Sequence, residues 1–157
     1  MDLFLLRHAQ AVEADVWDGS ERTRPLDAHG QAQAAALGAH LRRIGFSVDA
    51  ILSSPLTRAL ETAGAVASAL GLTVEQSDLV GPGFGPRRLG DLLAQRSEDR
   101  LLLCGHNPDL ERVTLQLSGG ARMGFGKGML VRFKLRRGEL GDAELKWVLP
   151  PSAYLPA

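Results

Sequence analysis

The chain lacks several features that extracellular, membrane and nucleic-acid-binding proteins usually have. Its 157 residues include one cysteine, Cys104, so neither an internal disulfide nor a metal cage of thiolates can form. The first apolar run, residues 3–6, is far shorter than a signal-peptide core or the roughly 20 apolar residues that cross a bilayer. Neither sign of charge is in excess, with 18 basic and 18 acidic side chains, whereas surfaces that bind DNA are usually basic. These absences predict a cytoplasmic protein without nucleic-acid or membrane partners.

The length and composition indicate one globular domain. A domain usually has about 100–200 residues. Hydrophobic residues make up 45% of the chain and charged residues 23%, as in ordinary soluble proteins. The sequence contains no internal repeat, low-complexity tract or linker that would divide it. We therefore expect residues 1–157 to form a single domain and the protein to be a monomer.

Short apolar runs alternate along the chain with longer amphipathic or alanine-rich stretches. This alternation is typical of an α/β fold with a largely parallel sheet, and we expect a three-layer α/β/α sandwich. The predicted strands are 3–6, 50–52, 73–75, 101–103, 129–135 and 144–148. The predicted helices are 28–43, 56–70, 87–96 and 109–117. In the strand 129–135 every second residue from Met129 onward is apolar, which predicts one buried face and one solvated face.

Three of the predicted helices begin after a residue that favours helix N-termini. Asp27 precedes the first of them, and the pairs Ser54-Pro55 and Asn107-Pro108 precede the second and the last. Asp, Ser and Asn side chains accept hydrogen bonds from the first free N–H groups of a helix, and proline is favoured at the first helical position. We therefore expect Asp27, Ser54 and Asn107 to be N-caps.

Arginine and histidine side chains follow three of the predicted strands. Arg7 and His8 follow the first, Arg58 comes after the second, and His106 follows the strand 101–103. In an open α/β sheet, ligands bind beyond the carboxyl ends of the strands, so we expect these four residues to share one pocket. Guanidinium groups and helix N-termini both bind anions, and a phosphoryl group suits them best. A histidine in such a pocket indicates a nucleophile.

Three motifs in this order resemble the histidine phosphatase superfamily, whose fold is phosphoglycerate mutase-like. They are Leu6-Arg7-His8-Ala9, then Ser53-Ser54-Pro55-Leu56-Thr57-Arg58-Ala59 with Thr62 and Ala63, and Gly105-His106-Asn107-Pro108. The short chain and the piece Arg24-Pro25-Leu26 ahead of an alanine-rich helix resemble SixA-type phosphohistidine phosphatases. The sequence departs from the superfamily at Ala9, where glycine is usual, and alanine does not reach the backbone angles that only glycine adopts.

The resemblance implies that His8 attacks phosphorus while Arg7, Arg58 and His106 surround the transferred phosphoryl group. Arg24, Ser54 and Asn107 are the further expected contacts of phosphate or substrate. Water then hydrolyses the phospho-His8 intermediate without a metal or another cofactor. In agreement, the chain has no H-E-x-x-H motif and no paired cysteines.

A proton donor for the leaving group is not evident in the sequence. Asp78, ahead of the glycine- and proline-rich loop 81–86, is the nearest candidate by position, and Glu13, Asp15 and Asp18 are alternatives. An imidazole leaves more readily than an alkoxide once its ring nitrogen is protonated. The missing acid therefore favours a phosphohistidine substrate over an alcohol phosphate.

The residues and the resemblance together predict a hydrolase that removes phosphate from phosphohistidine on a signalling or phosphotransfer protein. An alternative is a phosphomonoesterase for a small phosphorylated metabolite such as a sugar phosphate. A third possibility is a non-catalytic module that binds phosphorylated proteins, and the presence of both histidines and both arginines argues against it.

Overall fold

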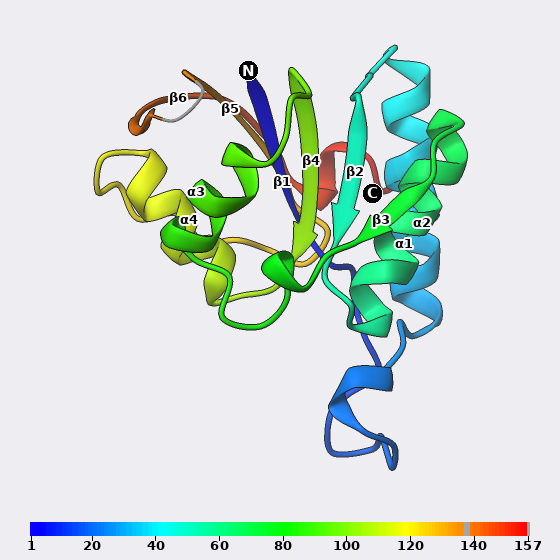
Figure 1. Cartoon of the computed structure of the whole chain (residues 1–157). Coiled ribbons are helices and arrows are strands. Elements are labelled where there is room, and N and C mark those ends of the chain that lie inside the picture. The colour runs from blue at the N-terminus through cyan, green and yellow to red at the C-terminus, as the bar shows by residue number, and fades with distance from the viewer. Residues whose placement is uncertain (137–138, 157) are drawn as a thin grey trace.

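A computed structural model describes residues 1–136 and 139–156, which form one six-stranded sheet with helices on both faces (Figure 1). The strand order is β3-β2-β4-β1-β5-β6. The strands β1 to β4 pair in parallel, and β5 and β6 are antiparallel additions at one edge. The bounds are β1 Asp2–Arg7, β2 Ala50–Ser53, β3 Val74–Gln76, β4 Arg100–Gly105, β5 Leu130–Arg136 and β6 Glu139–Leu149. The mostly parallel sheet expected from the sequence is thus confirmed.

Four α-helices form the two outer layers. They are α1 Ala28–Arg43, α2 Thr57–Leu70, α3 Pro86–Ala94 and α4 Asp109–Leu117. In Figure 1, α1 and α2 lie on one side of the sheet and α3 and α4 on the other. Each helix pair covers its own apolar core, so the arrangement is the expected three-layer α/β/α sandwich. None of the helices in the described part of the chain is long and apolar enough to span a membrane.

Strand β1 shows why a continuous apolar run marks a central strand. Leu3 and Leu5 pack into the core under α3 and α4, whereas Phe4 and Leu6 pack into the core under α1 and α2. Side chains alternate between the two faces of a strand, and both faces are covered here. Every position of the run is therefore apolar.

Strand β5 is covered on one face only over most of its length. Val131, Phe133 and Leu135 are buried, and Lys134 between them is exposed. The predicted one-sided strand is therefore confirmed over this stretch. Leu130 differs from the expectation of a solvated position, because it is fully buried in the core under α1 and α2.

The helix starts agree with the sequence in one case and differ in two. The Asp27 carboxylate accepts from the Gly30 N–H at 2.7 Å, so Asp27 is the N-cap of α1 as predicted. The predictions for Ser54 and Asn107 are wrong, because the N-caps of α2 and α4 are Leu56 and Pro108. Both polar side chains are used elsewhere, in contacts with residues distant in the sequence.

The carboxyl ends of three strands lie side by side, because β4 is hydrogen-bonded to β2 on one side and to β1 on the other. Beyond these ends, the His8 N–H donates to the Gly105 carbonyl at 3.1 Å, and the Ser54 N–H donates to the Cys104 carbonyl at 3.0 Å. The sheet thus brings together residues that are 50 positions apart in sequence in one case (54 and 104) and 97 in the other (8 and 105).

Candidate active site

Two imidazoles meet beyond the ends of β1 and β4. His8 follows β1, His106 follows β4, and their ring centroids are 5.1 Å apart. Each residue is 7% exposed. The two histidines follow different strands in the sequence, and the parallel pairing of these strands brings the two rings together.

The hydrogen bonding of His8 leaves one ring nitrogen available for nucleophilic attack. Its Nδ1 lies 2.7 Å from the Ala9 carbonyl oxygen, which can only accept, so Nδ1 carries the hydrogen. In the neutral ring, Nε2 then holds the free lone pair. Burial, reinforced by the nearby His106 and the charges of Arg58 and Arg7, lowers the pKa of His8 to about 3. His8 is therefore neutral at physiological pH.

Ala9 fits its position without a glycine-like conformation. No described residue other than glycine has a positive φ, so Ala9 is not forced into the left-handed region. Its N–H donates to the Thr62 hydroxyl at 3.0 Å, and that hydroxyl donates to the Arg58 carbonyl at 2.7 Å. These bonds tie the segment after β1 to the first turns of α2.

His106 is held by a serine from the neighbouring strand end. The Ser54 hydroxyl lies 2.7 Å from His106 Nε2, while His106 Nδ1 is buried without a hydrogen-bond partner among the described residues. Burial and the charge of Arg58 lower the pKa of His106 to about 4. Ser54 therefore reaches the predicted site, and in this structure it contacts the imidazole.

Two arginines supply positive charge to the histidine pair. Arg7 Nη1 donates to the Phe125 carbonyl at 2.6 Å, and Arg58 Nη1 donates to the Glu21 carbonyl at 3.0 Å. The Nε atoms of both arginines are buried and donate to no acceptor in the described part of the chain. Both arginine charges act on both imidazoles, where they lower the pKa. The charges of the two guanidinium groups thus favour the neutral form of both imidazoles.

Arg24 and Asn107, two further residues expected at the site, contact protein groups. Arg24 binds the Glu21 carboxylate through Nε and Nη2, and its Nη1 donates to the Val12 carbonyl at 2.6 Å. The Asn107 amide donates to Glu111 Oε1 at 2.7 Å and to the Phe125 carbonyl at 3.0 Å. Asn107 therefore joins α4 to the loop before β5.

The candidate proton donors lie outside this cluster. Asp78, at the start of a short 3-10 helix, has no hydrogen bond or ion pair with the two histidines or with Arg7 and Arg58 among the described residues. Glu13, Asp15 and Asp18 are exposed in the segment between β1 and α1. Glu21, which the sequence did not single out, forms an ion pair with Arg58 at 2.9 Å, and the charge of Glu111 acts on Arg7. The sequence indicates a role for Glu21 only through its position three residues before Arg24, a spacing that allows an ion pair.

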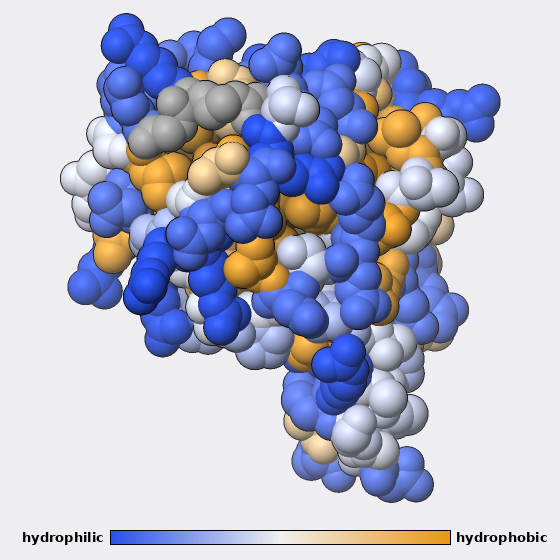
Figure 2. Space-filling view, viewed as in Figure 1, coloured by the Kyte–Doolittle hydropathy of each residue, from blue (hydrophilic) through white to orange (hydrophobic). Residues whose placement is uncertain are grey.

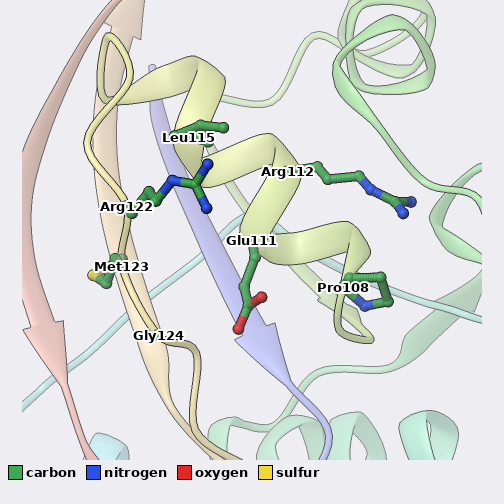
Figure 3. A pocket seen from close by; sticks show the side chains of 7 residues that line it. All are labelled: Pro108, Glu111, Arg112, Leu115, Arg122, Met123 and Gly124. Carbon is green, nitrogen blue, oxygen red and sulfur yellow. The ribbon is translucent and has the colours of Figure 1, made fainter.

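A cavity of about 360 Å³ lies between α4 and the loop before β5 (Figure 3). Its lining residues are Pro108, Glu111, Arg112, Leu115, Arg122, Met123 and Gly124. Glu111 connects the cavity to the site, because its Oε1 accepts from Asn107 and from the Phe125 N–H. Phe125 in turn accepts from Arg7, so one loop borders both the cavity and the arginine.

Possible metal ligands do not gather at the site. Within residues 1–136 and 139–156, no three His, Cys, Asp or Glu side chains lie close enough to hold a metal ion. Metal independence stays a prediction from the sequence.

Comparisons with known proteins agree with this geometry. Residues 3–80 match the histidine phosphatase superfamily (branch 1). An uncharacterized protein of Picosynechococcus sp. is 33% identical over 118 residues, which are 70% of this chain and 68% of that protein. The chain belongs to the histidine phosphatase superfamily and is a phosphatase.

Solved structures share the fold over almost the whole chain. The protein histidine phosphatase SixA complexed with tungstate has a TM-score of 0.84 and 22% identity, with 97% of this chain and 98% of that chain covered. A phosphoserine phosphatase from Entamoeba histolytica has a TM-score of 0.74 and 17% identity, with 98% and 99% covered. An alpha-ribazole phosphatase from Shigella flexneri has a TM-score of 0.74 and 20% identity, with 96% and 97% covered. The expected phosphoglycerate mutase-like fold is confirmed.

The low pKa values of the buried histidines predict how stability depends on pH. Above pH 6.5 the folded and unfolded chains both hold these imidazoles neutral, so they add no pH dependence. Below pH 6.5 the unfolded chain takes up a proton on each ring, and the folded chain does so only near pH 3 to 4. As the pH is lowered from 6.5 towards 4, the free energy of unfolding should therefore fall by about 1.4 kcal/mol per pH unit for each ring.

This dependence is measured by urea unfolding between pH 7 and pH 5, with the variant His8→Gln beside the wild type. The variant removes one titrating ring, so its slope should be smaller by one proton per unfolding event. Equal slopes in the two proteins would show that His8 has an ordinary pKa in the folded state.

Proposed function

We propose that this phosphatase removes phosphate from phosphohistidine on a protein, with His8 as nucleophile and without a metal. The observation that supports it is the neutral His8, whose Nε2 is free beside two arginines. In the first step, Nε2 forms a bond to phosphorus and the bond to the leaving nitrogen breaks. In the second step, water attacks phospho-His8, and inorganic phosphate leaves as the lone pair returns to Nε2.

The remaining groups stabilise the charge of the transferred phosphoryl group. A phosphoryl transition state carries its charge on the peripheral oxygens, so catalysis depends on positioning and on donors aimed at those oxygens. The Nε atoms of Arg7 and Arg58 supply two such donors. The Ser54 hydroxyl has one hydrogen and two lone pairs, so it can donate to His106 Nε2 while it accepts from the Leu56 N–H. In that arrangement His106 carries its hydrogen on Nδ1, which is buried without a partner among the described residues and offers a third donor.

The choice of substrate rests on the leaving group. Glu21 and Glu111 both border the cluster. The contact of Glu21 with Arg24 holds the pKa of that carboxyl below its usual value, so it is ionised and cannot donate a proton. Glu111 Oε1 accepts hydrogen bonds from Asn107 and from the Phe125 N–H. General acid catalysis typically contributes about 10²–10⁴-fold to a rate. An alkyl phosphate needs this contribution, whereas a phosphohistidine leaves as an imidazole that solvent can protonate. The site therefore favours phosphohistidine.

A phosphomonoesterase for a small metabolite is the second candidate. The structural neighbours include phosphatases named for phosphoserine and for alpha-ribazole, so this fold also carries small substrates. The cavity beside Glu111 offers about 360 Å³ for the rest of such a molecule. Monomeric state, cytoplasmic location and the absence of nucleic-acid and membrane partners stay predictions from the sequence.

A substrate comparison tests the proposal. The purified protein is assayed in EDTA with a phosphohistidine protein, an aryl phosphate and a panel of sugar phosphates. We expect kcat/KM to be at least about 10²-fold higher for the phosphohistidine protein than for any sugar phosphate, the lower bound of a missing general acid. A sugar phosphate that is hydrolysed as fast would replace the first candidate by the second, and activity that requires an added divalent ion would contradict the mechanism.

A further inference from the structure

A protruding segment between β1 and α1 carries Glu21 into the site. We call residues 12–25 the arm, and it projects beyond the carboxyl ends of the strands as a mostly hydrophilic extension (Figures 1 and 2). At its base, the Val12 N–H donates to the Pro25 carbonyl at 2.9 Å, next to the bridge between Ala11 and Leu26. Glu21 begins a short 3-10 helix in this arm.

Glu21 binds two arginines at once. Its Oε1 accepts from Arg24 Nη2 at 2.7 Å and lies 2.9 Å from Arg58 Nη2, and its Oε2 accepts from Arg24 Nε at 2.9 Å. Its main-chain carbonyl accepts from Arg58 Nη1 at 3.0 Å. Both Nη atoms of Arg58 are therefore held by a single residue, through its side chain and its main chain.

The carboxylate is itself fixed to the base of the arm. Arg24 holds it with two donors and donates from its third nitrogen to the Val12 carbonyl at 2.6 Å. A continuous chain of contacts thus runs from the main chain at Val12 through Arg24 and Glu21 to Arg58. Although the Glu21 side chain is 57% exposed, displacing it would break the links to both arginines.

We propose that Glu21 is a positioning residue that holds Arg58 so that its Nε edge serves the phosphoryl group. A guanidinium is planar and rigid, so fixing both Nη atoms also fixes the direction of the Nε–H bond. Arg58 is 6% exposed, and a buried cation without a counter-charge is costly. This role rests on the proposed function, because it acts through the arginine that stabilises the phosphoryl group.

A different role for Glu21, competition with the phosphoryl group for Arg58, predicts the opposite change in phosphate affinity. A carboxylate that competes with the phosphoryl group for Arg58 would weaken phosphate binding, and its removal would strengthen it. A supporting carboxylate strengthens phosphate binding, and its removal weakens it. The affinity for inorganic phosphate therefore separates the two roles, and it is measured without turnover.

The experiment compares Glu21→Ala and Glu21→Gln with the wild type and with Arg22→Ala, an exposed neighbour on the same short helix. Calorimetry gives the affinity for inorganic phosphate, and kinetics give kcat and KM. We expect kcat/KM of Glu21→Ala to fall about 10²-fold, as for a misplaced catalytic group, mainly through kcat, with weaker phosphate binding. Added acetate should restore part of the activity, Glu21→Gln should be intermediate, and Arg22→Ala should match the wild type.

The inference is overturned if Glu21→Ala keeps kcat/KM within about twofold of the wild type, a change below 1 kcal/mol, or if it binds phosphate more tightly. Thermal unfolding of both variants shows whether they fold, and a loss that acetate leaves unchanged with a lowered Tm would also overturn it. A wild type that hydrolyses no phosphorylated substrate would overturn the proposed function instead, and the phosphate affinities would still test the role of Glu21.

Discussion

Replacing His8 with alanine abolishes turnover on every phosphorylated substrate. The change removes Nε2, the atom that forms the bond to phosphorus, and no covalent intermediate can then form. The fold is expected to survive, because the His8 ring hydrogen-bonds to the adjacent Ala9 carbonyl and the strand β1 before it is unchanged. Steady-state rates, circular dichroism and transfer of radioactive phosphate to the protein give the three readouts.

The control for this variant is His29→Ala, which removes an exposed imidazole from the first turn of α1. We expect His29→Ala to keep wild-type activity and to become labelled during turnover, and His8→Ala to do neither. Full activity of the His8→Ala protein would show that His8 is not the nucleophile. A wild type that turns over without any labelled intermediate would indicate direct attack by water.

The strands and the meeting of the site residues were predictable for the same physical reason. A strand buried on both faces must be apolar throughout, so the runs 3–6 and 101–103 are visible in the sequence. Once these strands are parallel neighbours, the residues that follow them must lie at one edge of the sheet. Arg7, His8 and His106 then meet by topology alone.

Side-chain contacts that depend on the path of a loop were not predictable. Ser54 and Asn107 have the local chemistry of N-caps, but Ser54 binds His106 and Asn107 binds the Phe125 carbonyl. The N-caps of the helices α2 and α4 are Leu56 and Pro108 instead. Glu21 is separated from Arg58 by 37 residues, and the fold of the arm decides whether they meet. No local pattern encodes such a contact.

Replacing Arg58 with alanine lowers kcat by about 10³-fold, at the upper end of the effect of removing one preorganised donor, and also weakens phosphate binding. Arg58 gives the phosphoryl group a donor and a charge in a buried site, where both act strongly. The variant Arg58→Lys keeps the charge but loses the planar fork that Glu21 holds, so we expect it to recover little activity. Arg42→Ala, an exposed arginine of α1, is the control.

The charge of Arg58 also has a readout that does not depend on turnover. Arg58 is among the groups that lower the pKa of His106, where only burial has a larger effect, and it acts on His8 as well. Arg58→Ala should therefore raise the pKa of both rings towards 6.5, which NMR titration of the imidazole carbons measures. A large loss of kcat with unchanged pKa values would place Arg58 away from the histidines and would contradict the electrostatic role. A rise in both values together with the loss of rate would show that one guanidinium adds to the effect of burial in lowering the pKa of the nucleophile and also stabilises the group that it attacks.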